Sequence, residues 1–150
     1  GEPTLRSDVV GRAASAVAAI PAVRGVLLDV QHNFAAGSHG KRGAVIDGRD
    51  IGTVICPDAC AKLFVDARSE VRAHRRWLEL NGLGIAREEQ AVLSELLARD
   101  AADRARAISP LKQAPDADLL DTSDLSIDAA FAAALALVEP KVNTALAARL

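Results

Sequence analysis

The sequence predicts an α/β fold in which a parallel β-sheet is flanked by helices. Three short apolar runs bounded by turn residues are typical of buried strands, and they lie at 44–47, 61–67 and 117–122. Helical patterns separate or follow these runs, at 69–81, 87–106 and 126–138. Strands that alternate with helices favour a parallel sheet, because parallel neighbours require a crossover connection.

Two further helices are expected before the first strand. Residues 7–20 form a helical pattern that Ser7 can cap, and Pro21 prevents its continuation. Residues 22–36 repeat apolar side chains at helical spacing. The residues after Pro140 are expected to form one more, separate helix.

Composition narrows the classes of function. The 150 residues suit one domain or a piece of one, and half of them are hydrophobic, so a sizeable core is possible. The net charge of −2 creates no strong field, and aromatic residues make up only 3% of the chain. No apolar run approaches the ~18 residues of a membrane span. The sequence therefore predicts neither nucleic acid nor membrane as a partner.

The two cysteines stand close together in the stretch CPDAC, as Cys56 and Cys60. As metal ligands they would need further partners, and no Cys or His pair at zinc spacing accompanies them. Structural thiols in a reducing compartment are the favoured interpretation, and no metal-ligating residue is predicted.

The least ordinary stretch is AVIDGRDIGTVICPDA, at 44–59. Its apolar run ends at Asp47, and Arg49 and Asp50 then stand side by side between two glycines. Ligands of open α/β sheets bind beyond the carboxyl ends of strands, where this pair is expected to lie. Asp50 either contacts a ligand or is only the salt-bridge partner of Arg49.

Charged side chains also cluster on two of the predicted helices. One helix face carries residues at i, i+4 and i+7, and a second carries residues at i, i+3 and i+4. One interpretation is solvated faces with intrahelical salt bridges, such as Asp100 with Arg104. The other is an anion such as phosphate, held by several arginines. The two sets are Arg99, Asp103 and Arg106, and Arg72, Arg75 and Arg76.

Five motifs in order resemble bacterial cytidylate kinase, a P-loop nucleoside monophosphate kinase. The resemblance runs from about residue 4 to residue 138. The motifs are AASAVAAIPAVR at 13–24, DGRDIGTVICPDA, VRAHRRWLEL, LLARDAADRARAISPLK and ADLLDTSDLSID.

The resemblance implies part of a P-loop kinase fold. The chain contains no GxxxxGK[ST] loop, so the family's opening strand and donor-phosphate loop are expected before Gly1. The chain would then be the C-terminal two-thirds of such a kinase, and inactive alone. Residues 1–36 would be the helical part of the monophosphate-binding region. Residues 37–150 would complete the kinase core, with a mobile lid around 72–106.

The implied reaction transfers phosphate from ATP to CMP or dCMP, giving CDP or dCDP. Mg²⁺ would be bound mainly through the nucleotide phosphates. The implied partners are these small molecules, and the full-length protein is expected to be a cytoplasmic monomer. A second hypothesis is a truncated, non-catalytic nucleotide-binding or interaction fragment of such a kinase. A third is an α/β domain whose arginines are only surface charge.

The resemblance also assigns roles to individual residues. Arg49 would bind the CMP phosphate, and Asp50 would accept a hydrogen bond from the cytosine amino group. Further substrate-binding or catalytic roles fall on Ser15 and Arg24 at the base, Arg99 and Asp103 near the ribose hydroxyls, Arg106 at a phosphate, and Arg75 and Arg76, with Arg72, at the start of the lid over ATP.

Overall fold

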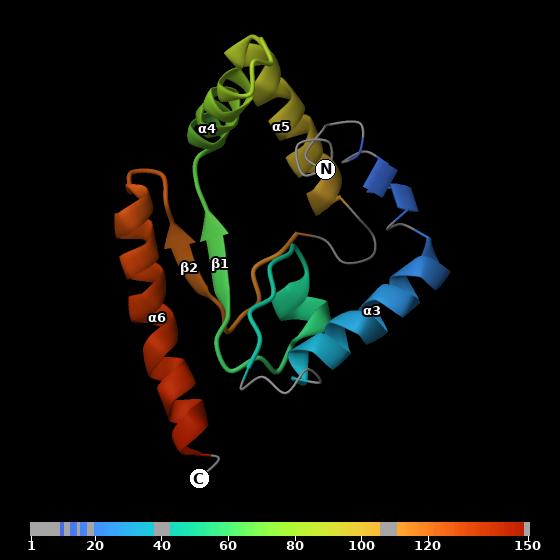
Figure 1. Ribbon diagram of the computed structural model, residues 1–150, viewed down its shortest axis with the longest axis vertical. Coiled ribbons are helices and arrows are strands. Elements are labelled where there is room, and N and C mark those ends of the chain that lie inside the picture. Colours follow the sequence, from blue (N-terminus) through green and yellow to red (C-terminus); the bar gives the residue numbers. More distant parts are fainter. Residues whose placement is uncertain are drawn as a thin grey trace. The chain divides into compact units, whose positions relative to one another are not determined.

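The computed structural model describes the following residues of the chain: 10, 13–14, 16–17, 20–37, 43–105 and 111–148. The chain forms two compact units, 1–47 and 48–150, and each is described here on its own. The second unit contains a parallel sheet and helices, so the α/β class is confirmed (Figure 1). The functional regions expected at 1–36 and 37–150 stay predictions.

The first unit contains helix α3, Pro21–Ala35. Pro21 begins this helix, where its missing N–H costs nothing and its fixed φ suits the first turn. The helix ends before Gly37, whose φ of +74° favours glycine. Within 7–20, the described positions 10, 13–14 and 16–17 are helical, as predicted. The proposed cap Ser7 lies outside the described residues.

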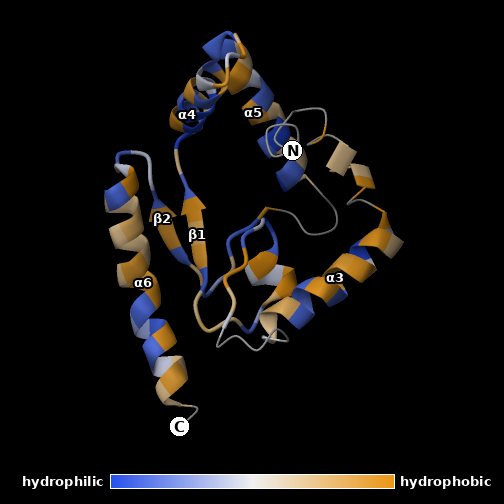
Figure 2. Ribbon diagram, in the orientation of Figure 1, coloured by the Kyte–Doolittle hydropathy of each residue, from blue (hydrophilic) through white to orange (hydrophobic). Residues whose placement is uncertain are grey.

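The second unit contains a sheet of two parallel strands, β1 (Leu63–Asp66) and β2 (Asp118–Asp121). Leu63 lies opposite Asp118 and Asp66 opposite Asp121. Both predicted strands and their parallel pairing are confirmed, and Figure 2 shows the apolar character of both. The predicted strand at 44–47 is wrong. These residues pair with no described strand, and apolarity alone cannot form a strand without a partner for its backbone groups.

Helices α4 (Ser69–Gly82) and α5 (Glu89–Arg104) pack against each other as a helical hairpin beyond the end of β1 (Figure 1). Both were predicted from helical spacing. The hairpin has its own small apolar core, and Gly84, with φ +75°, lies in the turn between the helices. Neither helix packs against the sheet or α6 through its backbone among the described elements. The core consists of Ala73, Leu80 and Val92, with Trp77, Leu93 and Leu96 around it.

Helix α6, Ile127–Ala147, packs alongside both strands. Ser126 caps it by accepting a hydrogen bond from the backbone N–H of Ala129 at 3.2 Å. The predicted break at Pro140 is wrong, because the helix continues through this residue. No described residue of the helix is buried, so water can satisfy a carbonyl that Pro140 leaves without a donor.

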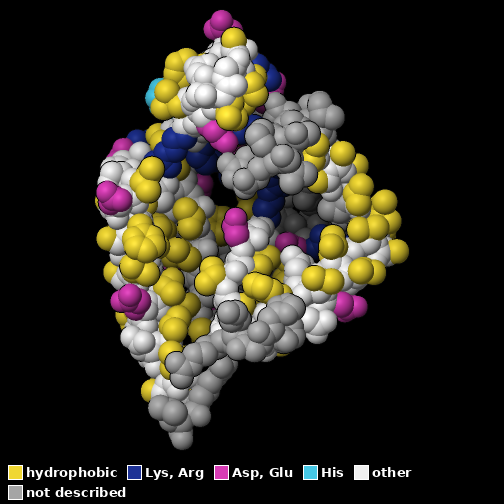
Figure 3. Space-filling model, in the orientation of Figure 1, with side chains coloured by type: hydrophobic (Ala, Val, Ile, Leu, Met, Phe, Trp, Pro, Cys, Tyr) yellow, Lys and Arg dark blue, Asp and Glu magenta, His cyan; other side chains and the backbone are white. Residues whose placement is uncertain are grey.

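Helix α6 also departs from the expectation that no segment reaches the length of a membrane span. Its 21 residues meet the length and composition of a spanning helix, a test that the core helix of a soluble protein also passes. Its apolar side chains are largely exposed, with Ile127 88% and Phe131 66% accessible. They contribute to the hydrophobic surface visible in Figure 3.

Candidate active site

Arg49 and Asp50 directly precede a single turn of π-helix, η1, Ile51–Ile55. The carbonyl oxygen of Asp50 accepts hydrogen bonds from the backbone N–H groups of Val54 at 2.9 Å and Ile55 at 3.3 Å. The N–H of Cys56 donates to Ile51 O at 2.6 Å. We call residues 48–56 the π turn. Turns of this kind are rare and often occur at functional sites.

Arg49 forms an ion pair with Asp103 of α5, with 2.6 Å between Nη1 and Oδ2. The Asp103 side chain is only 4% exposed, whereas that of Arg49 is 36% exposed. A buried carboxylate needs such a partner, because an unpaired buried charge is costly. The structure therefore brings together two predicted site residues that are 54 positions apart, and it gives Arg49 a carboxylate partner other than Asp50.

Of the other predicted substrate-binding residues, the structure describes two and leaves two outside the described residues. Arg99 is exposed on α5, one turn before Asp103. Arg24 is half-buried in the first turn of α3 and belongs to the first compact unit. Ser15 and Arg106 lie outside the described residues.

The three arginines of α4 separate into two groups. Arg72 donates to Asp100 Oδ2 of α5 at 2.7 Å and to the carbonyl oxygen of Ala67 at 2.9 Å. The hydrogen bond with Asp100 raises the pKa of Arg72 above its usual value, against the opposing effect of burial. Arg75 donates from Nη2 to the carbonyl oxygen of Thr122 at 2.6 Å and from Nη1 to its hydroxyl at 3.1 Å.

Arg76 instead pairs with Glu79 on the same helix at 2.8 Å. Arg72 and Arg75 therefore face the end of the sheet, while Arg76 has an intrahelical partner. Figure 3 shows basic side chains gathered beneath the hairpin, where α4 leaves the sheet. The expected intrahelical pairing of Asp100 with Arg104 is wrong, since Asp100 is buried and binds Arg72 across the hairpin.

Sequence reasoning missed Thr122 and Asp100 as partners of these arginines. Thr122 follows the last residue of β2, and both its N–H and its hydroxyl donate to the carbonyl oxygen of Asp66, at 2.8 and 3.1 Å. Its place beyond a strand's carboxyl end could have drawn attention to it. Asp100 gave no comparable signal, because helical spacing alone made Arg104 its nearest expected partner.

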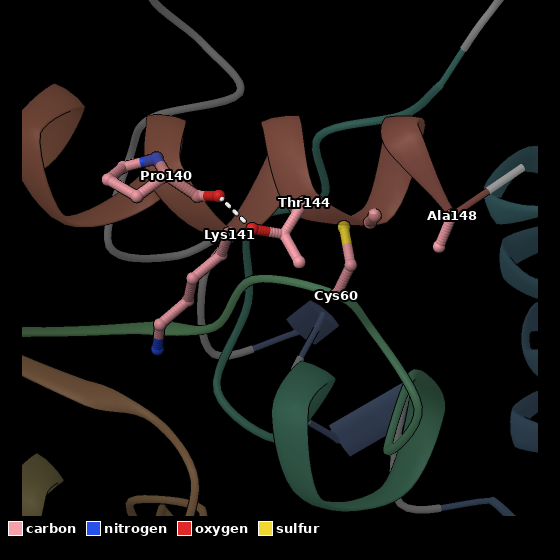
Figure 4. Close-up of a pocket in the computed structure, with 6 residues that line it drawn as sticks. Cys60, Pro140, Lys141, Thr144 and Ala148 are labelled. Atoms are coloured by element: carbon pink, nitrogen blue, oxygen red, sulfur yellow. Dashed lines mark hydrogen bonds between the residues drawn. The ribbon is translucent and has the colours of Figure 1, made fainter. Parts of the chain in front are cut away.

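A shallow hollow of about 450 Å³ lies between the Cys60 loop and the C-terminal half of α6. The Cys60 side chain points toward the helix between Thr144 and Ala148, and the Thr144 hydroxyl donates to Pro140 O at 2.8 Å (Figure 4). The lining includes none of the predicted site residues. Both cysteines are free thiols, and no group of metal-ligating side chains gathers within the described part of the chain.

Comparison with known proteins supports the resemblance. The family model described as cytidylate kinase matches residues 2–140. The chain is 53% identical to the cytidylate kinase of Afipia carboxidovorans over 139 residues, which cover 93% of this chain and 65% of the relative. It is 56% identical to that of Granulibacter bethesdensis over 137 residues, covering 91% of this chain and 64% of the relative. For the cytidylate kinase of Xanthobacter autotrophicus, the identity is 58% over 137 residues, with the same two shares covered.

The chain thus spans a little under two-thirds of the length of the curated relatives it matches. Its helices and its parallel two-stranded sheet are consistent with part of a P-loop kinase fold. With a family match over nearly the whole chain and more than half of the aligned residues identical, the chain belongs to the cytidylate kinase family.

Proposed function

We propose that these residues form the acceptor-nucleotide side of a cytidylate kinase, which transfers phosphate from ATP to CMP or dCMP. The observation that carries the proposal is the ion pair between Arg49 on the π turn and the buried Asp103. An arginine has five N–H donors in a planar fork, so one guanidinium can bind a carboxylate and a phosphate together. Asp103 would fix the Arg49 guanidinium where the CMP phosphate binds.

The remaining roles follow from the chemistry of phosphoryl transfer, which requires positioning and charge neutralisation more than covalent catalysis. Arg49, with Arg106, would bind the acceptor phosphate. Arg99 and Asp103 would lie near the ribose, and Ser15 and Arg24 near the base. Mg²⁺ bound to the ATP phosphates would neutralise charge on the transferred group.

The helical hairpin would act as the lid over ATP. Arg75 and Arg76 lie on α4, and closure of a lid excludes water, so that ATP is not simply hydrolysed. In the structure, the Arg75 guanidinium is bound by Thr122. Thr122 occupies two of its five N–H donors, so the remaining donors can bind a phosphate while these hydrogen bonds hold. Lid closure is therefore expected to add a nucleotide partner to the protein partner of Arg75.

Asp50 is proposed to select cytosine. A carboxylate accepts from the cytosine amino group and repels the carbonyl that uracil presents instead. The alternative, that Asp50 serves only to neutralise Arg49, is less favoured because Asp103 already pairs with that arginine. A non-catalytic binding fragment remains the second candidate function, because the 150 residues contain no GxxxxGK[ST] loop.

The test compares CMP and UMP binding by calorimetry, for the wild-type chain and for Asp50→Asn. The wild-type chain is expected to bind CMP more tightly than UMP, and the amide should narrow the gap, since it can donate to the uracil carbonyl. An unchanged CMP-to-UMP ratio would remove the base-reading role. Absence of CMP binding would remove the proposed acceptor site from this chain.

A coupled assay of CDP formation with ATP and Mg²⁺ separates the two candidate functions. We expect the chain alone to bind CMP without turning it over. A polypeptide that carries these residues together with a GxxxxGK[ST] loop should form CDP. Failure of that longer polypeptide to form CDP would favour the non-catalytic binding fragment.

A further inference from the structure

Lys62 is a buried charged side chain to which the proposed reaction assigns no role. It is 8% exposed, although lysines are almost never fully buried unless paired. Its Nζ donates to both carboxylate oxygens of Asp116, at 2.9 and 2.6 Å, and to the carbonyl oxygen of Pro57. An ammonium has three donors, and these acceptors match that number.

The hydrocarbon part of Lys62 packs beside the π turn. A Cβ placed on Gly52 would lie 3.4 Å from Cδ of Lys62 and 3.7 Å from Cβ of Ala114. Gly52 is the second residue of η1 and follows Asp50 by two positions. The Lys62 side chain therefore fills the space next to the turn, and its ammonium holds the loop at Pro57 that follows it.

The backbone of Lys62 is fixed independently of its side chain. Its carbonyl oxygen accepts from the N–H of Asp118 at 3.0 Å, a bond that belongs to the first pair of the parallel register, Leu63 opposite Asp118. One residue thus joins the sheet, the π turn and the turn containing Asp116. Through these contacts, the position of the π turn is tied to the sheet of the second unit.

We infer that Lys62 is a positioning residue, which holds the π turn so that Arg49 and Asp50 are presented to the acceptor nucleotide. It acts through the backbone of Gly52 and Pro57, and no contact with nucleotide is assigned to it. The effect of Lys62 on nucleotide binding rests on the proposed function, because the orientation of Arg49 and Asp50 matters only if they form an acceptor site. The immobilisation of the turn itself can be measured without any nucleotide.

The chain offers a matched control for this role. Lys141 of α6 pairs with Asp118 of β2 at 2.6 Å, the same distance as the shorter of the two contacts between Lys62 and Asp116. Lys141→Met therefore removes a comparable lysine–aspartate pair elsewhere in the same unit. Asp116→Ala against Asp118→Ala forms a second matched pair. Asp116 is 63% exposed at its side chain, so this substitution weakens the hold on Lys62 without opening a core.

The first measurement is amide hydrogen exchange of the π turn in the whole 150-residue chain without nucleotide. Lys62→Met should speed exchange of the Val54, Ile55 and Cys56 amides at least tenfold relative to the Thr122 amide, which binds Asp66 in the sheet. Asp116→Ala should also speed exchange of these three amides relative to the Thr122 amide, by a smaller factor. Lys141→Met and Asp118→Ala should leave the ratio of these exchange rates to that of Thr122 within twofold of wild type. A uniform change at all four amides would overturn the inference, since it would indicate general destabilisation.

The second measurement is CMP and UMP affinity at a temperature where all variants are folded. Lys62→Met should weaken CMP binding at least fivefold and narrow the CMP-to-UMP ratio, and Lys62→Arg should restore part of both. Wild-type affinity and ratio in folded Lys62→Met would overturn the inference. If Lys62→Met does not fold, Asp116→Ala decides by the same two measurements. If the wild-type chain binds no CMP, the proposed function fails, and hydrogen exchange alone decides whether Lys62 holds the turn.

Discussion

The body and the base of the helical hairpin are held by different forces. The body, around Leu80 and Val92, is closed by apolar packing, and the indole N–H of Trp77 donates to Arg87 O at 2.9 Å. The base, where α4 begins and α5 ends, is joined to the rest of the second unit by polar contacts, and neither helix lies close to the sheet or α6 through its backbone among the described elements. These contacts pair Arg68 with Asp124, Arg75 with Thr122 and Arg49 with Asp103.

This difference indicates which part of the hairpin can move. Apolar packing favours movement of the body as one piece, because separating its helices would expose its core. The exposed contact of Arg68 with Asp124 can be exchanged for water or for a charged ligand at small cost, whereas the contact of Arg49 involves the buried Asp103 carboxylate. A hairpin with this construction suits a lid, and its motion is expected to be controlled at the base.

The largest expected effect comes from the polar contact nearest the proposed nucleotide. Arg49→Ala should weaken CMP binding by about 2–5 kcal/mol, because it removes a phosphate partner and leaves the buried Asp103 carboxylate without the guanidinium. dCMP should be affected equally, and calorimetry measures both. Arg104→Ala, an exposed arginine beside Asp103, is the control and should change affinity less than twofold. A less than threefold loss with Arg49→Ala would exclude Arg49 from the site.

The second prediction tests the apolar body. Leu80 is 5% exposed, and Leu80→Ala should lower the free energy of unfolding of the hairpin by about 2–3 kcal/mol, through lost burial and a residual cavity. Amide exchange should accelerate throughout α4 and α5 and much less in β1 and β2. Leu78→Ala, on the same helix and 52% exposed, should have little effect. Equal acceleration of amide exchange in β1 and β2 would show that the body of the hairpin and the sheet unfold together. The body would then not be a separately stabilised part of the unit.

Sequence reasoning predicted the elements of this unit well where local signals decide. Helical spacing gave α4 and α5, and turn-bounded apolar runs gave β1 and β2. It failed where the outcome depends on long-range partners. The run at 44–47 has the composition of a strand, but no described strand pairs with it. At Pro140, exposure to water lets the helix continue past a residue that usually ends one.

The same limit applies to the candidate site. Periodicity placed Arg99, Asp103 and Arg106 on one face, but only the fold pairs Asp103 with Arg49. Lys62 gave no signal, because its importance lies in the backbone of Gly52, ten residues earlier, and in the turn at Asp116. Contacts of this kind are set by packing between segments distant in sequence, which a local pattern does not encode.

The third prediction concerns the ion pair between Arg72 of α4 and Asp100 of α5, which joins the two helices at the base and which we call the clasp. Arg72→Met should lower the free energy of unfolding by about 1–2 kcal/mol, because Asp100, 12% exposed at its side chain, loses a charged partner. The expected loss in the free energy of unfolding is moderate because Arg72 is itself 28% exposed, so solvent screens the pair. Arg76→Met is the control, since its pair with Glu79 lies within one helix and should contribute under ~0.5 kcal/mol. Equal losses for the two variants would contradict a special role of Arg72.

The smallest expected effect is a dependence of stability on acid pH at the exposed edge of the base. Arg68 binds Asp124 through two hydrogen bonds, at 2.9 and 2.6 Å, and lowers the pKa of that carboxyl. The Ser123 N–H donates to the Asp121 carboxylate at 2.8 Å, and hydrogen bonding by Ser123 lowers the pKa of Asp121. A carboxyl whose pKa is lower in the folded state binds fewer protons there than in the unfolded chain. Its stabilising contribution is therefore complete above the unfolded pKa of about 3.9 and disappears as pH falls through the folded pKa.

Urea unfolding between pH 7 and pH 2 measures this contribution. The unfolding midpoint should be insensitive to these two groups from pH 7 to about pH 5 and should fall at lower pH. Asp124→Asn removes one titrating group and should make the acid slope shallower, with little change near neutrality, because the pair is exposed on both sides. Asp58→Asn, at another exposed aspartate, serves as the control. If Asp124→Asn steepened the acid slope, or moved the midpoint at pH 7 as much as Arg72→Met does, the base would depend on this outer contact more than on the clasp between its helices.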